Sequence, residues 1–262
     1  MSSSAKLQLG FIGTGTITEA IVTGLVSGDG PMPEIFVSPR SAKTAARLAD
    51  MSPQVTVAPD NQGVVDAADM VFLAVRPNVA QDVVRALRFR PNQQVVSLIA
   101  TIDHASLQSW IATPVRIVRA VPLPFVATQS GVTTVFPPDR EVEALFSKLG
   151  KAVACSTIEE FDVLAATSAL MGSYFGMMDH VVHWMQTKGL PAENARTYLS
   201  QHFLSLSTVA ESHSSTPLED LRREYSTKGG LNQQMFAEFR KGGGLDALSD
   251  ALEAVLARIQ TH

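Results

Sequence analysis

The stretch Gly10-Phe11-Ile12-Gly13-Thr14-Gly15-Thr16-Ile17 decides the fold of this chain. The apolar run from Leu9 to Ile12 is typical of a buried strand. Two glycines follow at once, and apolar residues then continue at helical spacing as Ile21, Val22, Leu25 and Val26. A strand, a glycine turn and an amphipathic helix in this order favour the start of a dinucleotide-binding unit.

The turn itself predicts how a cofactor would be held. Gly13 would make the tight turn, and Gly15 would let the backbone approach a pyrophosphate. The backbone of Thr14, Thr16 and Ile17 and the positive end of the helix dipole would then face the phosphates. Because Thr18 stands where a third small residue is usual, the motif is imperfect, and an ordinary strand-to-helix turn is the alternative interpretation.

Composition narrows the class of protein. The 262 residues are 45% hydrophobic, which is enough for a core in two domains, and they carry a net charge of -4 with a pI near 5.9. An acidic chain predicts no nucleic-acid partner. Residues 1–6 lack the apolar segment of a signal peptide, and no run of about eighteen apolar residues predicts a membrane span. Cys155 is the one cysteine, which excludes an internal disulfide and favours a cytoplasmic protein.

Strands and helices alternate as far as residue 155. Apolar strands without polar interruption, such as 70–75, suit a parallel sheet covered on both faces. We therefore predict an α/β Rossmann-type doubly wound sheet in a dinucleotide-binding domain over residues 1–155. Its later strands are expected at 34–37, 54–57, 70–75, 94–98, 115–121, 131–136 and 152–155, and its later helices at 41–50, 61–67, 79–87, 104–111 and 140–149.

The spacing of apolar residues changes at about Ser156, where a helical pattern replaces the strand pattern. Helices are expected at 161–185, 192–212, 218–225, 231–240 and 245–259. The first of these carries more apolar positions than one buried face requires. An all-α C-terminal domain over residues 156–262 that pairs with a second subunit explains this surplus, giving a homodimer or a higher homo-oligomer built from dimers. A helix buried wholly within one subunit is the alternative.

The end of the second strand predicts which nucleotide is preferred. NAD-binding folds usually place a carboxylate there to accept hydrogen bonds from the ribose. Here the chain instead has Ser38-Pro39-Arg40-Ser41. Arg40 could bind a 2′-phosphate in a bidentate manner, and Ser38 and Ser41 could add hydroxyl groups. We expect NADP(H) to be preferred over NAD(H), although a solvated surface arginine is the alternative interpretation of Arg40.

With these residues in view, the chain resembles the pyrroline-5-carboxylate reductase family. The likeness extends over most of the chain and is clearest in four stretches: Gly10-Phe11-Ile12-Gly13-x-Gly15 with Glu19-Ala20-Ile21, Val71 to Pro77, Val118 to Pro122 before Gly131-Val132-Thr133, and Leu149-Gly150-Lys151. Members of this family reduce a cyclic imine with a nicotinamide cofactor to make proline, and their helical second domain dimerises.

The resemblance implies further cofactor contacts. Asn61 and the loop of Ala74, Val75, Arg76 and Pro77 would lie along the adenosine half, with Arg76 where the family usually has lysine. Val121 and Pro122 would approach the nicotinamide. After them the family usually has Asn-Thr-Pro, whereas this chain has Leu123-Pro124-Phe125 and so lacks a polar group there.

The substrate half departs from the family pattern. The family's Pro-Gly-Gly-x-Thr loop holds the substrate, and here the same place has Lys228-Gly229-Gly230-Leu231-Asn232. The resemblance implies a carboxylate cradle at Lys228, Gly229 and Gly230, with Asn232 orienting the substrate where the family has threonine. An interhelical turn and a solvated lysine are the alternatives.

Ser173 and Tyr174 are the remaining catalytic candidates, on the helix that would face the nicotinamide. Tyr174 could donate a proton, and an aromatic residue at an interface is the alternative. Asp179, His180 and His183 lie within one helical turn, but the two histidines have no further ligand nearby at metal-binding spacing, so we predict no metal site. His180 is a further candidate for acid–base chemistry.

These observations predict an NADPH-dependent reductase of a small, carboxylated and cyclic imine that gives proline or a related amino acid. A reductase or dehydrogenase of a different C=N or C=O substrate is one alternative. A catalytically silent NADPH-binding regulatory protein is the other.

Overall fold

The computed structural model describes residues 7–261, so the prediction about residues 1–6 lies outside the described residues. The chain forms two compact units. The first unit extends to Ala166 and also contains the segment from Leu256 onward, while the second unit is Thr167–Val255. The division therefore differs from the predicted boundary at Ser156, because the helix after the last strand packs its buried face within the first unit.

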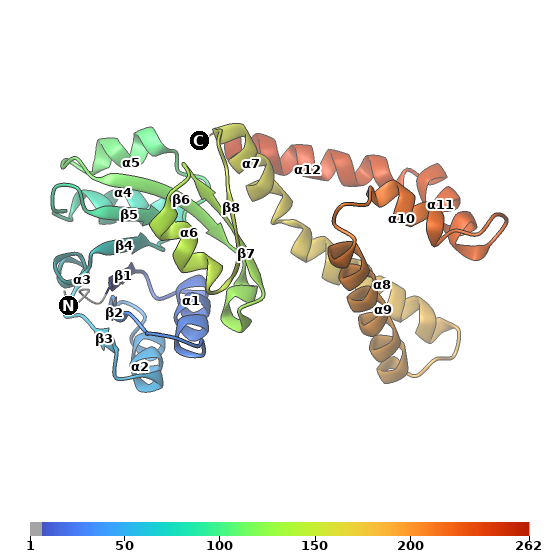
Figure 1. Ribbon diagram of the computed structural model, residues 1–262, viewed down its shortest axis with the longest axis horizontal. Helices are drawn as coiled ribbons and strands as arrows, with labels where there is room; N and C mark the ends of the chain where they lie inside the picture. Colours follow the sequence, from blue (N-terminus) through green and yellow to red (C-terminus); the bar gives the residue numbers. More distant parts are fainter. Residues whose placement is uncertain (1–6, 262) are drawn as a thin grey trace. The chain divides into compact units, whose positions relative to one another are not determined.

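A single eight-stranded sheet organises the first unit (Figure 1), and its strand order is β3-β2-β1-β4-β5-β6-β7-β8. The strands from β1 to β6 pair in parallel, β7 is antiparallel to β6, and β8 is parallel to β7. The Rossmann-type sheet is thus confirmed, with two further strands at one edge. The strands are β1 (Gln8–Ile12), β2 (Glu34–Val37), β3 (Val55–Val57), β4 (Met70–Leu73), β5 (Gln94–Ser97), β6 (Arg116–Pro122), β7 (Gly131–Phe136) and β8 (Gly150–Ala154).

Two apolar clusters, one on each face of the sheet, form the core of this unit. One cluster joins the sheet to α1 (Thr16–Val26), α2 (Ala42–Met51) and α6 (Arg140–Ser147). The other joins it to α3 (Asn61–Ala67), α4 (Pro77–Arg85) and α5 (His104–Trp110). All four residues of β4 are buried, as an unbroken apolar strand between two helical layers requires. A short 3₁₀ helix, η1 (Pro124–Thr128), follows β6 and was not predicted.

The predicted helix 161–185 is wrong, because two helices occupy this segment. α7 (Ile158–Thr167) ends before α8 (Leu170–Thr187) begins. Phe161 and Ala165 of α7 are buried in the first unit, whereas α8 has no buried residue. The helix is thus interrupted at the point where its residues are no longer buried in the first unit. The apolar periodicity did not reveal the break because both helices are rich in apolar residues.

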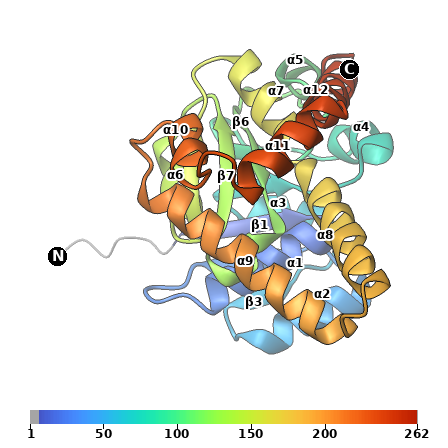
Figure 2. The same cartoon turned by 90° about the vertical axis from the view of Figure 1, so that its right-hand side faces the viewer.

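The second unit is entirely helical, as predicted. Besides α8 it contains α9 (Ala192–Ser212), α10 (Leu218–Glu224), α11 (Leu231–Lys241) and most of α12 (Gly244–Gln260). α8 and α9 pack against each other (Figure 2). α8, α11 and α12 have no buried residue, and large apolar side chains remain exposed, among them Phe175, Trp184, Tyr198, Leu204, Leu231 and Met235.

Within residues 7–261, no helix is both long enough and apolar enough to cross a membrane.

Candidate cofactor and substrate sites

The glycine turn is held by close tertiary contacts. Gly13 has φ +102°, and a Cβ atom there would collide with the carbonyl oxygen of Ala74. Its N–H donates to the Oγ of buried Ser38 at 2.9 Å, and its carbonyl accepts from the Oγ1 of Thr18 at 2.6 Å. Thr18 is therefore well suited to the third position, because its hydroxyl closes the turn onto α1.

Gly15 has a different role from Gly13. It precedes α1 with extended backbone, and a Cβ atom placed on it would meet no atom within 4 Å. No side chain caps this helix, so the first N–H groups of α1 are available to a ligand. The fold thus keeps a backbone-lined space open at the positive end of α1.

A pocket of about 400 Å³ lies beside this turn. It brings together eight of the predicted cofactor residues, which come from the β1–α1 turn, the β2–α2 loop and the β4–α4 loop. They are Gly13, Thr14, Gly15, Arg40, Ser41, Ala74, Val75 and Arg76. Asn78 and Val79 also line it and were missed, because α4 begins at Pro77, two residues earlier than the predicted helix 79–87.

The pocket fits a dinucleotide phosphate. Thr14 is 2% exposed, and its Oγ1 has no hydrogen-bond partner among the described residues, so it is available to a bound oxygen. The N-termini of α1 and α4, neither with a side-chain cap, border the same pocket. Arg40 and Arg76 add two positive charges. Backbone N–H groups, helix dipoles and guanidinium groups together favour an anion with several phosphate oxygens.

The structure places the other predicted cofactor residues elsewhere. Thr16 and Ile17 form the first turn of α1, while Asn61 and Pro77 begin α3 and α4. Ser38 is fully buried, its hydroxyl accepts a hydrogen bond from the Gly13 amide, and it does not line the pocket. Its contact with a 2′-phosphate stays a prediction.

The nicotinamide candidates end the strand β6. Val121 is half-buried and Pro122 is buried, and they pair with Thr134 and Thr133 of β7. Phe125, two residues after Leu123, is 44% exposed. The tip of β6 therefore continues into an apolar segment.

The glycine loop of the second unit differs from the predicted cradle. The N–H of Gly229 donates to Oε1 of Gln233 at 2.7 Å, and the N–H of Gly230 donates to the carbonyl of Thr227 at 2.8 Å. Both amides are thus engaged within the loop, so a carboxylate held by them would have to replace these hydrogen bonds. Gly230 precedes α11 without a side-chain cap, so the N–H groups of Leu231 and Asn232 have no acceptor within the helix.

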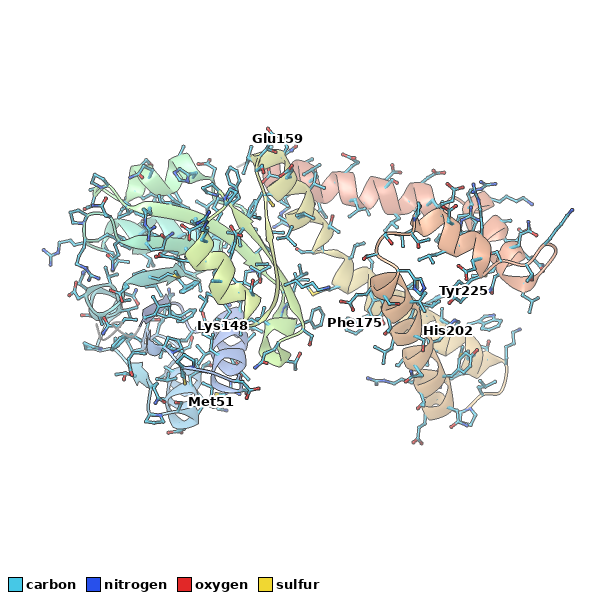
Figure 3. The ribbon with its side chains drawn as sticks, in the orientation of Figure 1. Met51, Lys148, Glu159, Phe175, His202 and Tyr225 are labelled. Carbon is cyan, nitrogen blue, oxygen red and sulfur yellow. The ribbon has the colours of Figure 1, made fainter. Side chains whose placement is uncertain are left out.

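Asn232 closes this loop, because its Nδ2 donates to the carbonyl of Tyr225 at 2.6 Å. Lys228 is exposed beside it. Ser173 and Tyr174 lie on the exposed side of α8, and the ring of Tyr174 packs edge-on against Phe203 of α9 at 5.6 Å. Figure 3 shows Phe175 and His202 on these same two helices. The packing favours the aromatic interpretation of Tyr174 over a proton donor.

Within residues 7–261, no group of three or more His, Cys, Asp or Glu side chains is placed to hold a metal ion. Cys155 is buried and free, and its burial raises the pKa of its thiol.

Two family models match the chain. Residues 8–101 match the model described as NADP oxidoreductase, coenzyme F420-dependent, and residues 159–262 match the pyrroline-5-carboxylate reductase dimerisation model. Pyrroline-5-carboxylate reductase of Vibrio alginolyticus is 28% identical over 264 residues, which cover 97% of this chain and 96% of the relative. The enzyme of Pisum sativum is 27% identical over 265 residues, which cover 97% and 96%.

The chain belongs to the pyrroline-5-carboxylate reductase family. Solved structures agree in fold: the Streptococcus pyogenes pyrroline-5-carboxylate reductase has a TM-score of 0.84 at 20% identity, with 99% of this chain and 100% of that chain covered. The Plasmodium falciparum reductase, whose structure has NADP bound, has a TM-score of 0.83 at 17% identity and covers 97% of each chain.

These matches confirm the resemblance to the family and the predicted fold class. The protein is therefore an NAD(P)-dependent oxidoreductase that acts on CH–NH groups. The match to the family's dimerisation model includes the whole second unit, in agreement with the unburied apolar helices of that unit.

Proposed function

We propose that the protein reduces the C=N bond of pyrroline-5-carboxylate to give proline, with NADPH as the preferred hydride donor. The observation that carries this proposal is the pocket at Gly13–Gly15, in a chain whose similarity to a pyrroline-5-carboxylate reductase covers 97% of its length. The predicted location in the cytoplasm follows the single buried cysteine and is part of the same proposal.

The preference for NADPH is supported by the surroundings of β2. No carboxylate follows this strand, and Arg40 and Ser41 line the pocket directly. Arg76 lines it from the β4–α4 loop. A 2′-phosphate would gain charge-assisted hydrogen bonds from these arginines, whereas the ribose of NADH would leave them without an anion.

The chemistry needs orientation more than proton transfer. NADPH supplies a hydride to the imine carbon when it is bound. The imine nitrogen carries a proton before reduction, so the C=N bond becomes a secondary amine without a strong acid from the protein. The chain's task is to hold the substrate and to exclude water. The uncapped N-terminus of α11 is proposed to bind the substrate carboxylate, with Lys228 adding charge and Asn232 fixing the loop.

Homodimerisation is part of the proposal, since the exposed apolar faces of α8 and α9 require a partner. Phe175 is 60% exposed and Leu204 is 60% exposed. A second copy of the chain would cover such faces through the family's dimerisation domain.

The test is NADPH oxidation in the presence of pyrroline-5-carboxylate, with wild type compared with Asn232→Ala and with Gln234→Ala, an exposed neighbour on α11. We expect turnover by wild type and by Gln234→Ala, and a kcat/KM at least about tenfold lower in Asn232→Ala. NADPH binding without turnover of pyrroline-5-carboxylate would reject this substrate. Turnover of other imines or ketones would then indicate a different reductase, and no turnover at all would indicate a regulatory protein.

A further inference from the structure

A buried arginine on β6 plays no part in the cofactor pocket. Arg119 is 3% exposed, and its Nη2 donates to the carbonyl of Ala100 at 2.7 Å. Its guanidinium carbon lies 4.6 Å from the ring centroid of Phe161, in a cation–π contact. Its Nε has no hydrogen-bond partner among the described residues. A guanidinium group with so few polar partners is costly to bury, so its place requires an explanation.

Arg119 joins the sheet to the helix through which the chain leaves the first unit. Phe161 of α7 is fully buried, and its ring lies 6.0 Å from that of Phe136. Phe136 is the residue paired with Arg119 across β6 and β7. Phe161 therefore contacts two facing residues of neighbouring strands, and Asp162 beside it attracts the guanidinium group electrostatically.

The end of α12, which belongs to the first unit, also lies beside Arg119. A small cavity of about 210 Å³ is lined by Arg119 and Asp162 together with Thr101, Asp103, Ile259 and Gln260. Ile259 and Gln260 belong to the end of α12, which is part of the first unit. Both segments that connect this unit to the rest of the chain thus border one buried guanidinium group.

The charges at this junction do not favour stability. Burial lowers the pKa of Arg119, and burial raises the pKa of Asp162, while the attraction between the two only partly offsets each effect. Each residue is therefore shifted toward its neutral form, as expected where desolvation exceeds the electrostatic gain. The contacts that Arg119 makes with β6, α7 and the end of α12 therefore explain its place better than net electrostatic stabilisation does.

We propose that Arg119 is a positioning residue that locks α7 and the end of α12 onto β6 and so holds the tip of this strand, Val121 and Pro122, in place for hydride transfer. Arg119 precedes Val121 by two residues, so both side chains lie on the same face of the strand. α7 leads directly into α8, which carries Ser173 and Tyr174. This inference rests on the proposed function, because it assigns Arg119 to the same reaction.

The test compares Arg119→Met with Arg116→Met. Arg116 lies on the same strand but is exposed and pairs with Glu141 at 2.8 Å, so it controls for loss of a β6 arginine. In Arg119→Met we expect kcat with pyrroline-5-carboxylate to fall at least about tenfold, while the Kd for NADPH stays within about twofold. Arg116→Met should match wild type. Arg119→Lys, which keeps a charged donor for Ala100, should recover part of kcat.

Hydrogen exchange of α7 and β6 amides provides a readout that needs no turnover. Exchange should accelerate in Arg119→Met and should be unchanged in Arg116→Met. Unchanged exchange in Arg119→Met, or a kcat within twofold of wild type, would overturn the inference. So would a loss of NADPH binding parallel to the loss of kcat. If wild type itself does not reduce pyrroline-5-carboxylate, the proposed function fails, and the exchange result then decides the structural part alone.

Discussion

The glycine turn of the first unit and the glycine loop of the second hold their backbones by different means. Gly13 and Gly229 both have positive φ, +102° and +74°. Gly13 packs closely against Ala74 and donates a hydrogen bond to Ser38, and both residues are far away in sequence. The amide of Gly229 instead donates a hydrogen bond to Gln233, four residues later. Contacts with the sheet therefore fix the proposed cofactor turn, whereas local hydrogen bonds fix the glycine loop of the second unit. Single substitutions can thus change the geometry of that loop.

The largest expected effect comes from placing alanine at each of these two glycines. In Gly13→Ala the new Cβ would meet the Ala74 carbonyl, and we expect a clearly lower Tm and NADPH affinity reduced at least about a hundredfold. Gly229→Ala is the matched control, because a Cβ there would meet no atom within 4 Å. It should retain NADPH binding and lose about 1 kcal/mol of stability. Thermal denaturation and NADPH titration measure both, and equal losses in the two variants would contradict the comparison.

The second prediction concerns the exposed apolar surface of each unit. Phe175→Glu should shift the dimer to monomer by raising the dimer dissociation constant at least about thirtyfold, because a charge would be buried in the proposed interface. Met51→Glu provides the control: Met51 is 38% exposed on α2 of the first unit, and both residues are labelled in Figure 3. Sedimentation velocity separates the species. Dissociation caused by Met51→Glu instead would place the interface on the first unit.

A third prediction sharpens the description of the cofactor turn. Arg40→Ala should raise the KM for NADPH about tenfold to a hundredfold and leave the KM for NADH nearly unchanged, since only NADPH has a 2′-phosphate. Arg47 on α2 pairs with Glu19 at 2.6 Å, and Arg47→Ala should change neither constant. Steady-state kinetics with both cofactors provide the measurement, and an equal change for NADH would show that Arg40 does not select the phosphate.

The smallest expected effect concerns Asp162, a buried carboxyl group of the first unit that is expected to lower stability at higher pH. Burial raises the pKa of Asp162 above its ordinary value, with attraction by Arg119 lowering it and repulsion by Glu159 raising it. A raised folded-state pKa means that stability is lost as pH rises through this pKa. Asp162→Asn does not ionise, so it should gain stability relative to wild type over that pH range. Urea unfolding from acidic to neutral pH would reveal this, and a constant difference would contradict it.

The cofactor half was largely predictable from sequence because its determinants are local and periodic. Unbroken apolar strands such as β4 require two covering layers, and the positive φ of Gly13 is a conformation that glycine adopts readily. Some features of this half were not predicted from the sequence. The burial of Ser38 under Gly13 leaves no signal in residue spacing. The early start of α4 did have a local signal, because Pro77 occupies the first helical turn, where proline is favoured.

The substrate half was less predictable for a physical reason. Gln233 and Thr227 engage the loop amides through side-chain and backbone positions that no periodicity encodes. The break between α7 and α8 reflects a change in what covers each helix, and two adjacent apolar helices have the same pattern as one long helix.

The buried hydroxyl of Ser38 has a practical consequence for redesign of the coenzyme preference. The end of β2 is the usual place to exchange residues when an NADPH-dependent enzyme is converted to NADH. Here Ser38 supports the Gly13 amide, so a carboxylate introduced at this position would lie in the core and compete with the turn itself. Conversion should therefore keep Ser38 unchanged and vary Arg40 and Ser41, whose side chains are exposed at the pocket.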